Sequence, residues 1–261
     1  AYCERTAVDE VIVGATSAIR DAANQQQVLA AFREVGLDAR VLSVDDEAYY
    51  GYLGVVNSMP IENGFFVDVG GGSAQVGRIT DRTLERSMSE PLGAVRMTEM
   101  FYGSERARRS EVKAQRQHVE AALTRHEWIS PSDLPLVGTG GAVRTLCAMA
   151  QRATGYPLSD VHAYSLAREV LDGLIDELIT RPVAQRRKIA GLKADRADII
   201  LAGAITIRAV MNAVSADRIE VCGQGLREGM FYEHYLAPRV PPLIADVRRS
   251  TIRNLAGNYR V

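Results

Sequence analysis

The chain has 261 residues and a mass of 28.5 kDa, with 47% hydrophobic and 24% charged residues. This length and composition are typical of a globular protein with one large or two modest domains and a substantial core. With 31 basic and 32 acidic residues the net charge is −1, so no overall positive field indicates DNA or an anionic membrane as a partner.

Cysteine usage and hydropathy bear on location. The three cysteines, Cys3, Cys147 and Cys222, are scattered and lack metal-binding spacing, and we expect Cys147 and Cys222 to be small core residues. No apolar run approaches the ~18 residues of a membrane span, and the first ten residues do not resemble a signal peptide. A cytoplasmic, reduced location is therefore expected.

Residues 1–60 show the rhythm of a parallel α/β unit. Strands are predicted at 10–14 and 39–43, with a helix near 26–35 between them. Asp45 and Asp46 are predicted to form the cap and first turn of a further helix that reaches about residue 56. We interpret this region as part of an N-terminal α/β domain.

Residues 61–240 are predicted to form a second α/β domain that opens with an antiparallel meander. The expected strands are 65–69, 74–79, 83–89, 134–137 and 217–222, and long amphipathic helices are expected near 105–126 and 165–180. Prolines after residue 237 predict a linker within 241–261, followed by a helical tail over 250–259.

Three glycine loops follow apolar strands, at 67–75 (VDVGGGSAQ), 137–145 (VGTGGAVRT) and 221–229 (VCGQGLREG). Glycine lets backbone approach a ligand closely, and consecutive N–H groups bind anions, most strongly where a helix begins. A single such loop is more often plain turn geometry, whereas three with adjacent Ser, Thr and Arg favour phosphate. The P-loop and dinucleotide-binding fingerprints are absent.

Two carboxylates stand out. Asp68 ends an apolar strand before glycines, where it is either a turn-capping residue or a Mg²⁺ ligand beside a phosphate. Glu47 belongs to an acidic run at a helix start, which usually complements the helix dipole. If that helix borders a cleft, Glu47 can orient or deprotonate a water.

Arg20 and Arg227 lie just after a strand and within a glycine loop. An arginine in such a turn is a better phosphate ligand than a typical surface arginine, because its planar fork suits oxyanions. The four histidines do not converge with Cys or Asp at ligand spacing, which disfavours a zinc site.

Taken together, the sequence resembles the exopolyphosphatase/guanosine pentaphosphate phosphohydrolase (Ppx/GppA) phosphatase family. The resemblance rests on seven blocks in order over most of the chain: ATSAIRDAAN (15–24), DDEAYYGYLGV (45–55), DVGGGSAQ (68–75), PLGAVRMTE (91–99), GTGGAVRTL (138–146), RADIILAGA (196–204) and GQGLREG (223–229).

The resemblance implies an α/β fold of the actin/hexokinase/Hsp70-like (ribonuclease H-like) type, with two domains around a cleft. It implies Mg²⁺, or another divalent cation, and removal of the terminal phosphate of inorganic polyphosphate or pppGpp by water. It also implies ppGpp as a ligand, a homodimer, and neither nucleic acid nor a membrane as a partner.

Carried onto this chain, the resemblance makes Glu47 the catalytic carboxylate and Asp68 the metal ligand. The implied phosphate-binding residues are Arg20, Gly70, Gly71, Gly72, Ser73, Gly140 and Arg227.

The chain departs from the family pattern in three places. The family's opening DxGSNSxR strand and loop are absent upstream of residue 15, which suggests a first domain that is incomplete here. Gln75 stands where the family commonly has Glu, and a neutral amide can neither act as a base nor add charge for a metal. The tail over 250–259 resembles the start of a helical extension that stops at residue 261.

Three functions remain open from the sequence. The leading one is a Mg²⁺-dependent phosphoanhydride hydrolase. The second is a catalytically weak or inactive protein that binds (p)ppGpp or polyphosphate, which the Gln75 difference favours. The third, a sugar or acetate kinase-like member of the same superfold, is disfavoured by the family-specific blocks.

Overall fold

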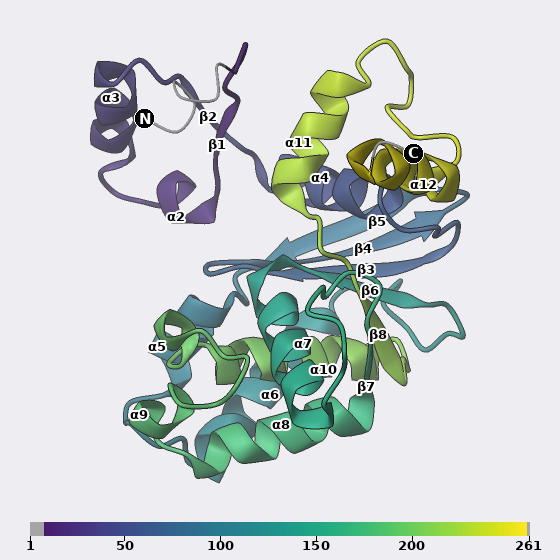
Figure 1. Ribbon diagram of the computed structural model, residues 1–261. Helices are drawn as coiled ribbons and strands as arrows, with labels where there is room; N and C mark the ends of the chain where they lie inside the picture. The colour runs from purple at the N-terminus through teal and green to yellow at the C-terminus, as the bar shows by residue number, and fades with distance from the viewer. Residues whose placement is uncertain (1–7, 260–261) are drawn as a thin grey trace.

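The computed structural model describes residues 8–259 and centres on a six-stranded mixed sheet of order β5-β4-β3-β6-β8-β7 (Figure 1). The central strands β3, β6 and β8 run parallel, and the pairs β3–β4, β4–β5 and β7–β8 are antiparallel. The strand bounds are β3 Gly64–Val69, β4 Ala74–Thr80, β5 Thr83–Glu90, β6 Leu136–Thr139, β7 Ser165–Ala167 and β8 Arg218–Val221.

Helices cover both faces of this sheet (Figure 1). One face carries α5 Ala94–Phe101, α6 Arg109–Leu123, α7 Gly140–Thr154, α8 Arg168–Thr180, α9 Val183–Arg186 and α10 Ile200–Ala213, with a short 3₁₀ turn at Ala194–Arg196. The opposite face carries α4 Val44–Val56 and α11 Leu226–Tyr235, with α12 Val247–Tyr259 beside them. Helix α10 is apolar on nearly every side because it packs among α5, α6, α7 and α8 in the core.

The period-two alternation of β3 divides the core into two clusters. Phe65, Val67 and Val69 point toward the α7 and α10 layer, and Phe66 points toward α4, where it joins Leu53. The same alternation places Asp68 on the α4 side of the sheet, at the carboxyl end of the strand.

Helices α4 and α11 pack at very short range through glycines. A Cβ on Gly54 would collide with the carbonyl group of Gly225, and one on Gly229 would collide with the carbonyl oxygen of Tyr50. The Tyr50 hydroxyl also donates a 2.6 Å hydrogen bond to Glu233. The two glycine contacts hold the amino-terminal part of α11, which follows the third glycine loop, against α4.

The N-terminal residues form a small unit with parallel strands β1 Val13–Ala15 and β2 Ala39–Val41 and helices α2 Ser17–Arg20 and α3 Gln25–Glu34. Helix α4 falls in the predicted 1–60 domain, yet it packs against strands β3 to β6 of the main sheet. The division of the chain at residues 60 and 240 stays a prediction.

Most predicted elements are confirmed, including the antiparallel meander of β3, β4 and β5. The predicted helix at 165–180 is wrong over Ser165–Ala167, because these residues pair with β8 as the edge strand β7. The cap of α4 is Ser43, two residues before the expected Asp45.

Cys147 and Cys222 are fully buried core residues, as expected, and burial raises the pKa of both thiols. Cys3 lies outside the described residues.

The segment after α11 is tied to the sheet by side chains that bind its backbone. Arg82 donates a 2.7 Å hydrogen bond to the carbonyl of Ile244, and the Ile244 amide donates to Asn57 at 2.7 Å. The predicted helical tail is confirmed as α12. Within residues 8–259, none of the helices has the length and apolar character needed to cross a bilayer.

Two glycine substitutions test the close α4–α11 contact. Gly229→Ala should lower the free energy of unfolding by about 1–3 kcal/mol, because the new methyl group forces two backbones apart. Gly173→Ala is the matched control, since that site is exposed in the middle of α8 with open space around it. The control should gain about 0.5–1 kcal/mol from helix propensity in the same urea titration. Equal effects of the two changes would contradict the packing.

Candidate active site

A row of polar residues crosses four strands near their ends. The sheet register places Ser89 opposite Gln75, Gln75 opposite Asp68, and Asp68 opposite Thr139. Because residues in register share a face, the four side chains lie on the α4 side, at the carboxyl edge of the parallel strands. Ligands of open α/β sheets bind at this edge.

Helix α4 points its amino end at this row. Ser43 caps the helix by accepting from the Asp46 amide at 3.0 Å, and the Asp46 carboxylate accepts from the Ser43 amide at 2.9 Å. This capping box fixes the first turn, and Glu47 in that turn is 6% exposed and directed toward the sheet. The helix dipole favours a carboxylate there.

Both oxygens of Glu47 have partners. Arg20, from the end of α2, forms an ion pair with Oε1 and donates a second hydrogen bond to the Leu42 carbonyl at 3.0 Å. The Ser73 hydroxyl and the Gln75 amide lie 3.4 and 3.3 Å from Oε2. The arrangement holds Glu47 between the N-terminal unit and the main sheet.

The side-chain amide of Gln75 is the hub of this network. Its Nε2 donates to Ser73 at 2.8 Å and to Ser89 at 2.9 Å, and the side chain is buried beside the Glu47 carboxylate. A neutral donor at this position leaves Glu47 and Asp68 as the two acids of the site. The sequence flagged Gln75 as a departure, and the structure assigns it the contacts of a positioning residue.

Asp68 occupies a tight recess. Gly140, in the left-handed region with φ +83°, lies so close that a Cβ there would collide with the Asp68 carboxylate, and Gly225 borders the other carboxylate oxygen. Desolvation by burial raises the pKa of Asp68 from 3.8 to about 6; Arg144 opposes this shift and Glu47 adds to it. No group in residues 8–259 donates a hydrogen bond to this carboxylate.

The glycine loop between β3 and β4 is held by hydrogen bonds from α5 to its carbonyl groups. The amides of Ala94 and Val95 at the start of α5 donate to the carbonyls of Gly70 and Gly71, each at 2.9 Å. A Cβ on Gly72 would stand 2.6 Å from the Ser17 hydroxyl oxygen. With the carbonyls engaged by α5, the amides of Gly71, Gly72 and Ser73 have no backbone acceptor in the described chain, which suits an anion.

The structure brings most of the predicted site residues together. Glu47, Arg20 and Ser73 form one network, and Asp68 and Gly140 form the adjacent recess. Arg227 lies on the first turn of α11 with its side chain 84% exposed and 3.5 Å from Glu228. Its contact with phosphate stays a prediction.

Sequence reasoning missed two arginines. Arg144, on the first turns of α7, donates to the Gly223 carbonyl at 3.3 Å and acts electrostatically on Asp68. The Arg196 guanidinium lies over Gly141, where a Cβ would displace it. The rule that selected Arg227, an arginine just after a glycine loop, also selects Arg144. Arg196 carries no local signal, because only the fold brings it to the loop.

Residues 2–237 match the sequence profile of the Ppx/GppA phosphatase family. The chain belongs to the Ppx/GppA phosphatase family.

Among curated relatives of this Ppx/GppA chain, exopolyphosphatase 1 of Mycobacterium tuberculosis is 33% identical over 229 residues, covering 85% of the chain and 66% of the relative. The bifunctional 3-dehydroquinate synthase/phosphatase of Fusobacterium nucleatum is 27% identical over 220 residues, covering 81% of the chain and 32% of the relative. The chain thus spans about two thirds of the length of its mycobacterial relatives.

Solved structures show the same fold. The crystal structure of the Aquifex aeolicus Ppx/GppA family member superposes with a TM-score of 0.79 at 30% identity, covering 91% of this chain and 78% of that one. An exopolyphosphatase from Cytophaga hutchinsonii gives a TM-score of 0.80 at 24% identity, covering 89% and 77%. The expected α/β fold of the family is confirmed.

The residues present fit a magnesium ion bound mainly through substrate. No group of three or more His, Cys, Asp or Glu side chains in the described residues is arranged as a metal cage. Mg²⁺ at phosphate sites instead takes one or two carboxylates together with phosphate oxygens and waters. Asp68 supplies one such carboxylate, and no residue in the part of the chain that the structure describes donates a hydrogen bond to it.

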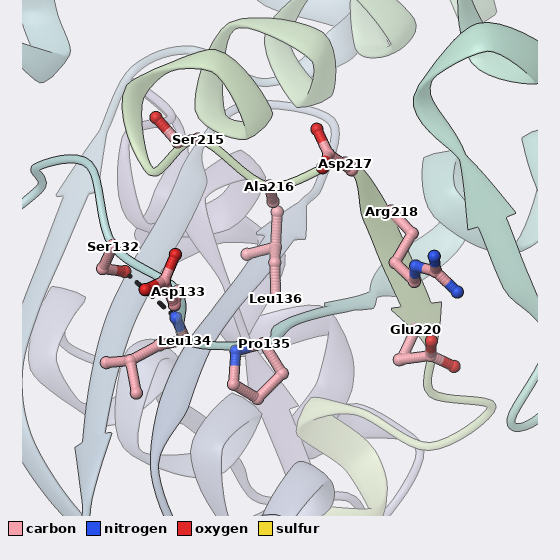
Figure 2. Close-up of a pocket in the computed structure, with 10 residues that line it drawn as sticks. All are labelled: Ser132, Asp133, Leu134, Pro135, Leu136, Ser215, Ala216, Asp217, Arg218 and Glu220. Carbon is pink, nitrogen blue, oxygen red and sulfur yellow. Dashed lines mark hydrogen bonds between the residues drawn. The ribbon is translucent and has the colours of Figure 1, made fainter.

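A separate cavity of about 330 Å³ lies at the other end of the strands. Figure 2 shows its lining, which comes from the first residues of β6 and β8 and the segments before them, with Asp133, Asp217, Arg218 and Glu220 around it. It is distant from the carboxyl edge that carries the polar row, and none of the predicted site residues lines it.

The raised pKa of Asp68 predicts a pH-dependent stability difference. A carboxyl group whose pKa rises on folding binds more protons in the folded state, so it lowers stability as pH increases from about 3.8 to 6. Asp68→Asn should therefore raise the melting temperature at pH 7.5, and the gain should disappear near pH 4. Asp195→Asn is the control, because Asp195 is exposed and its replacement removes no buried carboxylate. A gain that is equal at both pH values would contradict the assignment.

Proposed function

We propose that this chain hydrolyses the terminal phosphoanhydride of inorganic polyphosphate with the help of Mg²⁺. The observation that carries the proposal is Glu47, held by Arg20 at the amino end of α4 and facing the glycine loop across the polar row. The exopolyphosphatase relatives support the same substrate class.

In the proposed reaction, Glu47 binds the attacking water and accepts its proton. Each carboxylate oxygen has two lone pairs, so Oε2 can accept from a water beside its weak contacts to Ser73 and Gln75. Oxygen of that water forms a bond to the terminal phosphorus, and the bridging P–O bond breaks. The shortened polyphosphate leaves with the bond's electron pair.

The chain's remaining residues hold the phosphate and balance its charge. The free amides of Gly71, Gly72 and Ser73 are suited to the terminal phosphate oxygens, and Arg144 and Arg196 add positive charge at the start of α7. Asp68 would hold the Mg²⁺, which when bound neutralises phosphate oxygens in the transition state. Hydrolysis of this kind depends on positioning and charge more than on covalent chemistry.

The guanosine nucleotide pppGpp is proposed as a second substrate, because its 5′ end presents the same terminal anhydride. A catalytically weak or inactive binder of polyphosphate or (p)ppGpp is the second candidate function. It is favoured by Gln75, whose neutral amide donates to Glu47 and supplies no further carboxylate for a metal.

Phosphate release separates the two functions. If the chain is a hydrolase, it should release phosphate from long-chain polyphosphate or from pppGpp in the presence of Mg²⁺. EDTA should abolish this release, because the carboxylate of Asp68 needs the metal ion to lie beside a phosphate. Release should be measured for both substrates side by side. Calorimetric binding of ppGpp or polyphosphate without any release would favour the binder.

Glu47→Gln should lower kcat by about 10²–10⁴-fold, because an amide cannot accept the proton from water. Asp45→Asn is the matched control: Asp45 lies in the same helical turn, is exposed, and has no contact with the polar row. The measurement is kcat for phosphate release from polyphosphate by both variants. Parent-like turnover in Glu47→Gln would remove Glu47 from the mechanism.

A further inference from the structure

Positive charge is concentrated in two segments of a chain whose net charge is −1. Residues 106–116 contain five basic residues and one acid, and residues 181–193 contain five basic residues and no acid. The fold brings the two segments together, because the Val183 amide donates to the Glu105 carbonyl at 2.9 Å. The positive charges of Arg186 and Arg116 both lower the pKa of the Tyr102 hydroxyl, against the larger effect of burial.

Six exposed cations of these segments define what we term the basic face: Arg106, Arg109, Lys113, Arg116, Arg187 and Lys188. Some arginines elsewhere are paired with acids, as in the Arg208–Asp172 and Arg125–Glu90 ion pairs. Within residues 8–259 none of the six forms a salt bridge. The charges of these six side chains are therefore not neutralised by a direct ion pair, although Asp176, Glu105 and Asp198 lie in the adjoining hollows.

Three of these cations line an open groove of about 630 Å³ between α6 and α8. Arg109, Lys113 and Arg116 follow one another at spacings of four and three residues, so they form a row along one side of α6. Like charges at this spacing repel each other, and an anion in the groove removes the repulsion. Asp176 is the single acid of the groove.

The basic face begins one helix length from the glycine loop. Helix α5 starts on the carbonyls of Gly70 and Gly71, and its 8 residues correspond to about 12 Å. Tyr102, at its far end, borders a second cavity of about 390 Å³ together with Arg186 and Arg187. Thr180 lines the α6–α8 groove and Val183 the second cavity, so the two hollows adjoin.

We propose that the basic face binds the distal part of a linear inorganic polyphosphate chain whose terminal phosphate lies at the glycine loop. This inference rests on the proposed function. Unpaired guanidinium and ammonium groups suit a chain of phosphates. The groove residues include no aromatic ring, whereas proteins that bind single-stranded nucleic acids stack bases on aromatic side chains. Occupancy of both regions raises the affinity for long chains only.

The test replaces the row of cations and a matched set. The variant Arg109→Gln/Lys113→Gln/Arg116→Gln is compared with Arg248→Gln/Arg249→Gln/Arg253→Gln, which removes the same charge from exposed positions of α12 at the other end of the molecule (Figure 1). Readouts are kcat and KM for tripolyphosphate and long-chain polyphosphate, and long-chain binding to Glu47→Gln forms of each protein at several salt concentrations.

The row variant should raise KM for long-chain polyphosphate about tenfold and leave kcat and the tripolyphosphate kinetics unchanged, while the α12 variant matches the parent. In a plot of log affinity against log salt concentration, the slope for the row variant should be shallower by about 2. This is the value for three lost phosphate contacts at ~0.7 each. Parent-like affinity in the row variant, equal losses in both variants, or tighter binding of single-stranded RNA would overturn the proposal. Salt-dependent binding that needs the row, in a protein that releases no phosphate, would support the basic face and refute the hydrolase.

Discussion

The register of four strands beneath the amino end of α4 is the constraint on which this site depends. It sets Ser89, Gln75, Asp68 and Thr139 side by side on one face. A shift of one residue in β3 would turn Asp68 into the core and Phe65 or Val67 toward α4. The apolar pattern that builds the core therefore also fixes which polar side chains face α4, and the α4 capping box fixes the helical turn that places Glu47 opposite them.

Two carboxylates share this small region, and the structure treats them differently. Glu47 has an arginine on one oxygen and two neutral donors on the other, so its charge is compensated within the protein. No residue among 8–259 donates a hydrogen bond to Asp68, and its burial raises its pKa to about 6. Charge compensation for Glu47 therefore comes from direct contacts within the described chain, whereas Asp68 has only the electrostatic influence of Arg144.

Helices packed around the sheet hold the glycine loops of this site in place. Glycine contacts between α4 and α11 hold the third loop against Asp68 and Thr139, and the start of α5 engages the carbonyls of the first loop. The same α5 leads away from the loop toward the cations of α6 and α9. An overall charge near zero hides this separation, since acids elsewhere on the surface offset the basic face.

The sequence by itself determined most of the strands, several helices, the three glycine loops and the resemblance to the family, because apolar periodicity and glycine turns are local signals. The helices α5 and α10 were not predicted. The sequence also singled out Glu47, Asp68 and Gln75. Tertiary structure decided that Ser165–Ala167 form a strand, because β8 offers them an edge, and that Arg196 reaches Gly141. It alone joined residues 106–116 to 181–193 into one face, since contacts between distant segments leave no trace in local spacing.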